Sequence, residues 1–181
     1  PGSEGNLQAA EFIVDHLRSL DLDPKIHSFS LPFRKVTQAE IYVDGNTFTL
    51  QPFLYNAITP QTTEDDGIEA PLIYVGSGSM GELKGKPIKD NIILMDFNSG
   101  IAWQRLASLG ARAAILVDNG KVRGRHFFEE KEELTPIRFP IFWMEKEQVS
   151  AIFGPEFQEH AVTAQTVRLK SSIEWAETIS R

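Results

Sequence analysis

The chain has 181 residues, of which 41% are hydrophobic and 24% are charged, so it contains enough apolar sequence for a folded core. Its formal net charge of -7 argues against a nucleic-acid partner, because binding to phosphate requires clustered lysine and arginine side chains. The sequence has no cysteine, which excludes disulfides, a thiolate nucleophile and cysteine-based zinc or iron–sulfur sites. No apolar stretch approaches the roughly 20 residues of a membrane span, and we expect no membrane contact by this segment.

The first predicted element is an amphipathic helix that ends near Asp21. Ser3 or Asn6 can cap its N-terminus. Its apolar residues recur at helical spacing and form one stripe: Ala9, Ile13, Leu17 and Leu20. After Pro24, larger side chains alternate with serines, and this alternation predicts a strand with one covered face: His27, Phe29, Leu31 and Phe33.

A β-hairpin is predicted next, with Gly45-Asn46 as its two-residue turn. Two pairs of apolar residues then oppose each other on one face: Val43 with Phe48, and Ile41 with Leu50. Residues 52–70 contain two prolines and an acidic cluster, which favour a loop. A buried strand is predicted at 72–75.

The centre of the sequence reads as strand, helix, strand. The apolar run 92–95 predicts a buried strand, and 102–109 repeats apolar residues at helical spacing before Gly110 in a C-cap position. A second apolar strand spans 111–117. Such a unit is almost always parallel and right-handed, and its continuously apolar strands need cover on both faces. We therefore expect this unit to form the centre of the core.

Residues 120–136 form a charged excursion after the second strand. Loops longer than about 12 residues are uncommon unless they have a function or are disordered. Five residues in this loop combine the side chains that dominate binding hot spots: Arg123, Arg125, His126, Phe127 and Phe128. They are candidates for contact with a substrate or partner. The alternative is that the two phenylalanines only attach the loop to the core.

The remaining sequence predicts further regular elements. A strand is expected at 140–144, and a short helix at 145–153 that ends at Gly154-Pro155. Two closing strands are expected at 162–169 and 173–179.

The motifs that would indicate chemistry within this chain lack their structural context. Gly76–Gly81 matches G-x-G-x-x-G, with Asp96 about 20 residues later, but Gly85 and Pro87 interrupt the helix that a dinucleotide site requires. We interpret it as a glycine-rich turn between two strands and keep small-molecule binding as an alternative. The four histidines show no zinc-ligand spacing, and no G-x-S-x-G turn exists. We therefore assign no catalytic residue and no metal ligand.

Several segments resemble the protease-associated (PA) domain. They are APLIYVG at 70–76, GK at 85–86 ahead of NIILMD at 91–96, ASLGARAAIL at 107–116 and FPIF at 139–142. The first residues, PGSEGN at 1–6 followed by AA at 9–10 and FI at 12–13, resemble the start of M28-family zinc aminopeptidases, in which a PA domain is often inserted. The turn after Asp96 lacks the glycine-cysteine pairing common in PA domains, and Asp21 stands where the aminopeptidases often have glycine.

The resemblance implies an α+β fold with a β-rich PA core around the strand–helix–strand unit, plus a helix and strand from a peptidase domain. The implied divisions are 1–33 for the peptidase fragment, 34–170 for the PA domain and 171–181 for the return segment. No cofactor is expected in this chain, because the zinc ligands and catalytic glutamate would lie beyond Arg181.

The implied function is that of a non-catalytic portion flanking the active-site cleft, which modulates substrate access or protein contacts. Its partners would be the catalytic domain in cis and, as a candidate, peptide substrate. The parent would be extracytoplasmic: secreted, periplasmic or membrane-attached. The alternative is a PA-type protein- or peptide-binding module whose parent is not a peptidase.

Overall fold

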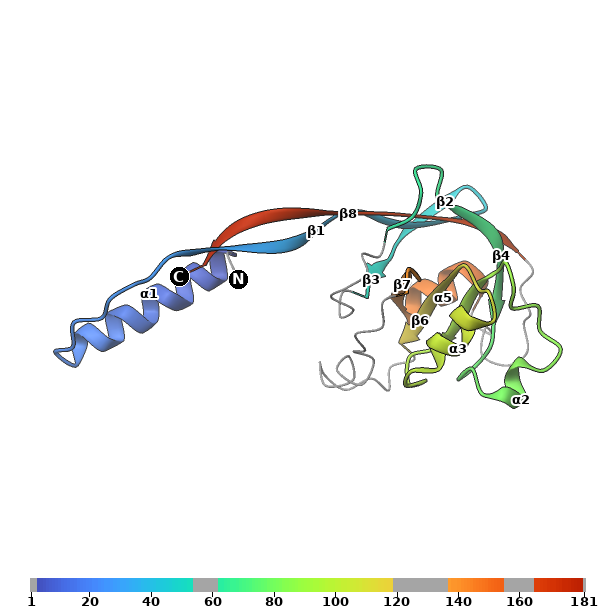
Figure 1. Ribbon diagram of the computed structural model, residues 1–181, viewed down its shortest axis with the longest axis horizontal. Helices are drawn as coiled ribbons and strands as arrows, with labels where there is room; N and C mark the ends of the chain where they lie inside the picture. The colour runs from blue at the N-terminus through green and yellow to red at the C-terminus, as the bar shows by residue number, and fades with distance from the viewer. Residues whose placement is uncertain (1–2, 54–61, 119–136, 155–164, 181) are drawn as a thin grey trace. The chain divides into compact units, whose positions relative to one another are not determined.

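The computed structural model describes residues 3–53, 62–118, 137–154 and 165–180 (Figure 1). The chain divides into two compact units. Unit 1 comprises Pro1–Lys35 and Glu174–Arg181, and unit 2 comprises Val36–Ile173. The domain boundaries expected at 33/34 and 170/171, between the peptidase segments and the PA domain, stay a prediction.

Unit 1 begins with the predicted amphipathic helix, α1 (Glu4–Ser19). Ser3 caps it, since its Oγ accepts a hydrogen bond from the backbone N–H of Asn6 at 3.2 Å. The helix ends where Asp21 adopts a φ of 58°, which a helix cannot continue. Unit 1 also contains the outer parts of two long strands, β1 (Phe29–Val43) and β8 (Thr166–Ser180).

Unit 2 is built on an eight-stranded mixed sheet with the strand order β2-β1-β8-β4-β5-β6-β7-β3. Its other strands are β2 (Asn46–Thr49), β3 (Gln51–Pro52), β4 (Ile68–Tyr74), β5 (Ile92–Asp96), β6 (Ala113–Asp118) and β7 (Ile141–Glu145). Its helices in the described ranges are α2 (Met80–Leu83), α3 (Ala102–Ser108) and α5 (Lys146–Phe153). The α+β fold class is confirmed.

The predicted strand–helix–strand unit is also confirmed. β5 and β6 pair in parallel, with Ile92 opposite Ala113, and α3 connects them. β4 and β7 extend the parallel region on either side. Every residue from Ile92 to Met95 is buried, because the sheet is covered on both faces.

The sheet closes on itself through Leu50. β2 pairs with β1 at one end of the strand order, and β3 pairs with β7 at the other, although only Leu50 separates β2 from β3. The backbone N–H of Leu50 donates to the carbonyl of Ala39 at 2.8 Å, and that of Phe53 donates to Ile141 at 2.8 Å. The Leu50 side chain is fully buried at this corner.

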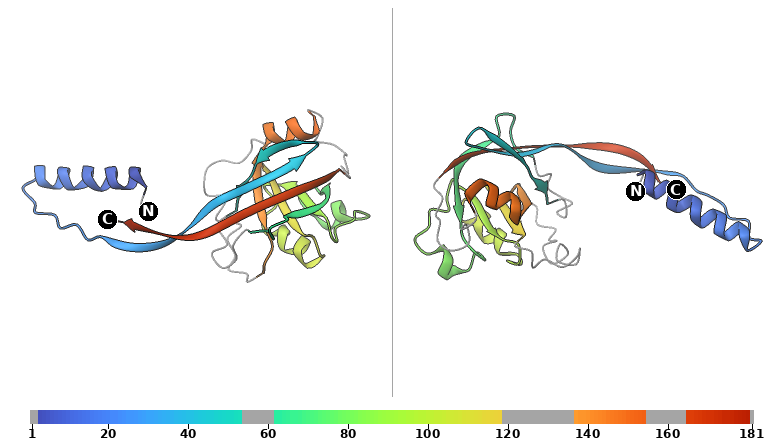
Figure 2. Two further views of the ribbon diagram at one scale, coloured as in Figure 1. Left: turned by 90° about the horizontal axis from the view of Figure 1, so that it is seen from above. Right: turned by 180° about the vertical axis from the view of Figure 1, so that it is seen from behind.

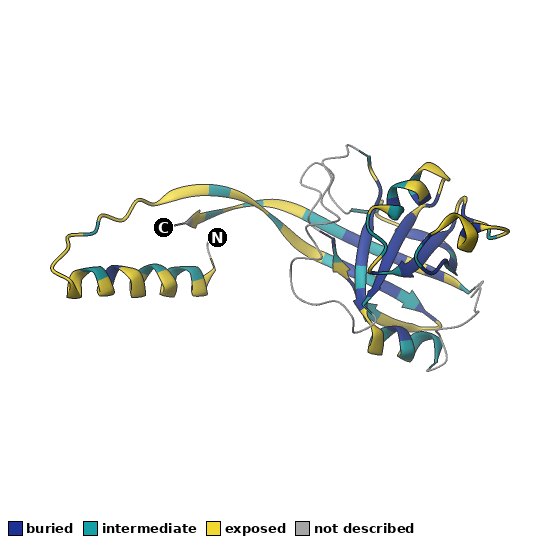
Figure 3. Ribbon diagram, turned by 90° about the horizontal axis from the view of Figure 1, so that it is seen from below, coloured by how far each residue is buried: buried dark blue, intermediate teal, exposed yellow. Residues whose placement is uncertain are grey.

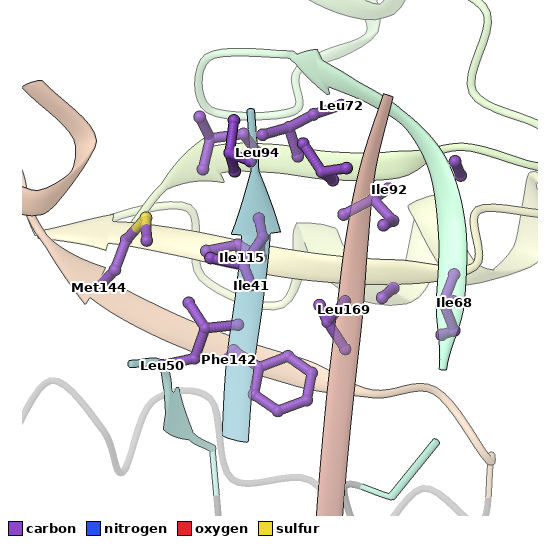
Figure 4. Close-up of a cluster of buried hydrophobic side chains, with 14 of the residues drawn as sticks. Ile41, Leu50, Ile68, Leu72, Ile92, Leu94, Ile115, Phe142, Met144 and Leu169 are labelled. Carbon is purple, nitrogen blue, oxygen red and sulfur yellow. The ribbon is translucent and has the colours of Figure 1, made fainter. Parts of the chain in front are cut away.

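Two apolar clusters fill unit 2. Side chains from the antiparallel and parallel strands meet in the first, where Ile41, Leu169 and Phe142 approach one another (Figure 4). The second lies on the other face of the parallel strands and includes Trp103 and Leu106 of α3. Figure 2 shows α3 on the side of the parallel strands away from β1 and β8.

Three expectations about the antiparallel strands were wrong in detail. The hairpin turn is Asp44-Gly45, so Ile41 lies opposite Phe48 and Val43 opposite Asn46. Both turn residues have positive φ, 48° and 79°, as a two-residue turn of this hand requires. The register differs by two residues from the expected one, so the apolar side chains keep the same face.

The other two corrections concern strand length. The strand expected at 27–33 and the first hairpin strand are one element, β1, and the two closing strands are one element, β8. The polar interruption in β8 is bridged by Thr63, whose N–H donates to the Ser171 carbonyl at 2.9 Å while its Oγ1 accepts from the Ser171 N–H at 3.1 Å. These bonds satisfy the buried backbone of Ser171, and the strand continues.

Candidate functional site

The predicted contact cluster falls outside the described residues. This applies to all five of its members: Arg123, Arg125, His126, Phe127 and Phe128. Their assignment to substrate or partner contact stays a prediction. Asp118, at the carboxyl end of β6, is the last described residue before them.

The glycine run follows β4 at the carboxyl edge of the parallel strands, where α/β sheets commonly bind ligands. The carboxylate of Glu82 occupies the turn. It accepts hydrogen bonds from the hydroxyls of Ser77 and Ser79, both at 2.6 Å, and from their N–H groups at 3.3 and 3.2 Å. The turn therefore already binds an anion, which belongs to its own chain.

These contacts explain the low pKa of Glu82 and the glycine at position 76. The bonds from the Ser77 hydroxyl, then from Ser79, lower the pKa of Glu82 from 4.5 to about 2. Gly76 has a φ of +57°, and a Cβ added there would collide with Oε1 of Glu82. Only glycine leaves room for this carboxylate.

The arrangement argues against dinucleotide binding by the glycine run. A phosphate would need the N–H groups of Ser77 and Ser79 that Glu82 occupies. The helix that forms here, α2, has only four residues and ends before Gly85, as the interruption by Gly85 and Pro87 predicts. Ser79 and Glu82 stand at capping-box spacing, a sequence signal that could have identified this contact.

A second pair at this edge joins Tyr74, at the end of β4, to Asp96, at the end of β5. The Tyr74 hydroxyl donates to Oδ1 of Asp96 at 2.6 Å. Burial, followed by this hydrogen bond, raises the pKa of the Tyr74 phenol. Nζ of Lys86 donates to the Tyr74 carbonyl at 2.7 Å and lies 5.9 Å from the centre of its ring. Tyr74 is therefore held as a neutral donor that links neighbouring strands.

Within the described ranges, no group of three His, Asp or Glu side chains is placed to hold a metal ion. His16 stacks on Phe12 in α1, with ring centroids 6.4 Å apart. His126 and His160 lie outside the described residues. None of the described helices is long and apolar enough to span a bilayer.

The ribbon formed by β1 and β8 within unit 1 exposes large apolar side chains on both faces. The Ser30 hydroxyl reaches Oε2 of Glu177 at 3.5 Å, so these two side chains share a face. Because side chains alternate along a strand, Trp175 lies on that face and Phe29 on the opposite one. Trp175 is 61% exposed and Phe29 51%. The expectation of one covered face was therefore wrong for this part of β1.

The surface of α1 is equally apolar. Only Val14 of α1 is buried, whereas Phe12 is 73% exposed and Ile13 57% (Figure 3). A hollow of about 300 Å³ lies between α1 and residues 24–27, and Ile13, Val14 and Leu17 line it. Apolar patches of this extent are unusual on a complete soluble domain and typically mark a surface that packs against another.

Comparison with known proteins gives a match by structure. No family model matches the sequence, and no curated protein is significantly similar to it. An aminopeptidase from Aneurinibacillus sp. strain AM-1 is 18% identical with a TM-score of 0.58, and the match covers 99% of this chain and 42% of that one. A zinc aminopeptidase from Bacillus subtilis is 20% identical with a TM-score of 0.63, covering 98% and 41%.

A peptidase M28 precursor from Shewanella amazonensis SB2B is 16% identical with a TM-score of 0.58, covering 99% of this chain and 44% of that one. The chain thus spans less than half the length of each of these proteins. At this identity the similarity is one of fold. The described chain has the fold of a part of these aminopeptidases.

Proposed function

We propose that this chain is the non-catalytic, PA-type portion of an M28-like zinc aminopeptidase, in which unit 2 flanks the active-site cleft and modulates substrate access or protein contacts. One observation carries the proposal: almost the whole chain matches the zinc aminopeptidase of Bacillus subtilis at a TM-score of 0.63, while covering 41% of that enzyme. The match includes unit 1 as well as unit 2, because 98% of this chain is covered.

The surface of unit 1 supports the proposal. Its ribbon carries Trp175 on one face and Phe29 on the other, which is the pattern of a strand pair inside a sheet covered on both sides. An isolated two-stranded ribbon is marginally stable in water. The remainder of a peptidase domain, acting in cis, would supply the missing strands and the cover for both faces.

The described residues do not fit a zinc site, since no three candidate ligands come together among them. In the proposal, the zinc ligands and catalytic glutamate come from other parts of the parent, and the described part of this chain contributes shape and contact surface. We also propose an extracytoplasmic location for the parent, which would be secreted, periplasmic or membrane-attached.

Two enzyme preparations test the proposal. The chain of residues 1–181 should not hydrolyse aminoacyl-p-nitroanilides at any zinc concentration, whereas the complete parent protein of the proposal should do so in a zinc-dependent way. Zinc-dependent turnover by residues 1–181 alone would overturn the assignment, and so would an inactive parent protein that binds no zinc.

A deletion tests the role of unit 2. In the parent protein, Val36–Ile173 is replaced by a short Gly-Ser linker between Lys35 and Glu174. Zinc content should be retained, while the dependence of kcat/KM on peptide length should change, because the wall beside the cleft is removed. An unchanged kcat/KM for dipeptide, tetrapeptide and octapeptide substrates would contradict a role in substrate access.

The second candidate is a PA-type protein- or peptide-binding module whose parent is not a peptidase. The lack of a metal-binding group among the described residues agrees equally with both candidates. The sequence of the complete parent protein separates the two candidates. A His-x-Asp motif soon after a further strand supports the peptidase, and its absence supports the binding module.

A further inference from the structure

A hollow of about 330 Å³ lies at the amino ends of the parallel strands, within unit 2. Ala111 and Arg112 approach it just before β6, Arg138 and Phe139 approach it before β7, and Gly67 lies just before β4. Its volume is at the lower end of the range of small-ligand sites. It is at the opposite end of these strands from the glycine run and Tyr74.

Two arginines line this hollow. Arg112 is held in place by its backbone N–H, which donates to the Asn91 carbonyl at 2.9 Å, and by its Nη1, which donates to the Glu69 carbonyl at 3.0 Å. Arg138 is exposed beside Phe139. Among the described residues, neither guanidinium lies within ion-pair distance of a carboxylate. Both therefore retain donors for an anionic ligand.

The rest of the lining is mixed: two threonines and one acidic residue lie beside a smaller apolar part. Phe139 and Ile68 are buried side chains of the wall, and Pro140 is buried beside them. Glu64 also lines the hollow, and the neighbouring Thr63 is fixed to β8 by its bonds to Ser171. A dianion would be repelled by Glu64, whereas a single carboxylate can be balanced by two arginines.

We propose that this hollow binds the C-terminal carboxylate of a peptide whose last side chain is apolar. The planar guanidinium group of an arginine can donate two parallel hydrogen bonds to a carboxylate. Phe139 and Ile68, which line the hollow, offer an apolar contact for the last side chain of the peptide. The inference does not depend on the proposed peptidase function, because it concerns only described residues of unit 2.

The hollow on the outer face of β1 and β8 provides a contrast. It has about 360 Å³ and is lined by Tyr42, Glu69 and Arg168 among others. There the one arginine is already paired, since Nη2 of Arg168 lies 2.6 Å from Oε2 of Glu69, and the carboxylates of Glu69 and Asp44 offset the charge of Lys170. The hollow at Arg112 and Arg138 is therefore the better anion site.

Titration of the ¹⁵N-labelled chain with N-acetyl-L-leucine, followed by ¹H–¹⁵N correlation spectra, tests the proposal. We expect saturable shifts of the amides of Ala111, Arg112 and Phe139. N-acetyl-L-leucinamide, which lacks the carboxylate, should bind at least about tenfold more weakly, because charge-assisted hydrogen bonds are lost. N-acetylglycine should bind more weakly than N-acetyl-L-leucine, and inorganic phosphate should produce no saturable shift at these amides.

Variants identify the responsible side chains. Arg138→Gln, at a residue with no hydrogen bond to another described side chain, should weaken N-acetyl-L-leucine binding by about tenfold and leave the remaining spectrum unchanged. Arg138→Lys should recover part of the affinity by keeping the charge. Lys84→Gln, which removes an exposed cation outside the hollow, is the control and should have no effect.

Several outcomes would overturn the proposal. These are equal binding of the acid and the amide, equal binding of phosphate, unchanged affinity of a folded Arg138→Gln variant, or the absence of saturable shifts at the three amides.

Discussion

The contact between Glu82 and the glycine run provides the sharpest test of the structure. In Glu82→Gln, the side chain loses its charge and one of two oxygens, of which Oε2 alone accepts three of the four bonds from Ser77 and Ser79. Hydrogen bonds to a charged group contribute about 1.5–3 kcal/mol where they are buried. Glu82 lies largely in solvent, so we reduce the expected loss of unfolding free energy to about 1 kcal/mol for the whole set.

The pH dependence follows from the lowered pKa of Glu82. A carboxylate with a pKa of about 2 in the folded chain and 4.5 in the unfolded chain binds fewer protons when folded. Its contribution is therefore complete above pH 4.5 and is lost as the pH falls towards 2. The difference in unfolding free energy between wild type and Glu82→Gln should be about 1 kcal/mol at pH 7 and should disappear near pH 2.

Urea unfolding monitored by the fluorescence of the buried Trp103 measures this difference. Asp65→Asn is the matched control, because it removes an exposed carboxylate from a turn of unit 2 and should change stability by less than about 0.5 kcal/mol. Equal stabilities of wild type and Glu82→Gln at pH 7, or a difference that persists unchanged at pH 3, would show that these hydrogen bonds to the Glu82 carboxylate do not stabilise the fold.

Three further predictions concern other contacts. Gly76→Ala should destabilise unit 2 by about 1 kcal/mol in the same unfolding assay, because alanine is strained at a φ of +57° and its Cβ would also displace the carboxylate of Glu82; a neutral result would contradict a left-handed backbone at Gly76. Tyr74→Phe should lower the free energy of unfolding by about 1 kcal/mol, because the hydrogen bond to Asp96 is lost. The pKa of Tyr74 is raised in the folded chain, so its contribution to stability is present below pH 10 and is lost at higher pH. Spectrophotometric titration should therefore find a tyrosine in the wild type that ionises above pH 10 and is missing from the variant. Trp175→Ser should lower the binding of an apolar dye to the chain without changing the urea midpoint of unit 2, and an unchanged dye signal would argue that Trp175 is covered.

Much of the parallel half of unit 2 was predictable from short stretches of sequence. The continuous apolar run of β5, the helical spacing in α3 and the apolar run of β6 are local signals, and one arrangement of such elements dominates. The N-terminal helix was predictable for the same reason, since Ser3 is a standard cap.

Less of the candidate site was predictable. The contact of Glu82 with the glycine run was not predicted, because the motif alone does not show which anion binds there. The capping-box spacing of Ser79 and Glu82 was a sequence signal for this contact. The hollow at Arg112 and Arg138 combines residues that precede different strands. Periodicity indicates which residues of one element share a face, but it carries no information on which elements meet.

Sequence patterns alone were enough to locate the three longer helices α1, α3 and α5 and the apolar parallel strands, and to indicate an α+β fold without cysteine chemistry. Tertiary structure decided the hairpin register, the continuity of β8 through Ser171, and the closure of the sheet at Leu50. The physical reason is that each of the latter depends on hydrogen bonds or packing between residues far apart in the chain, such as Thr63 with Ser171.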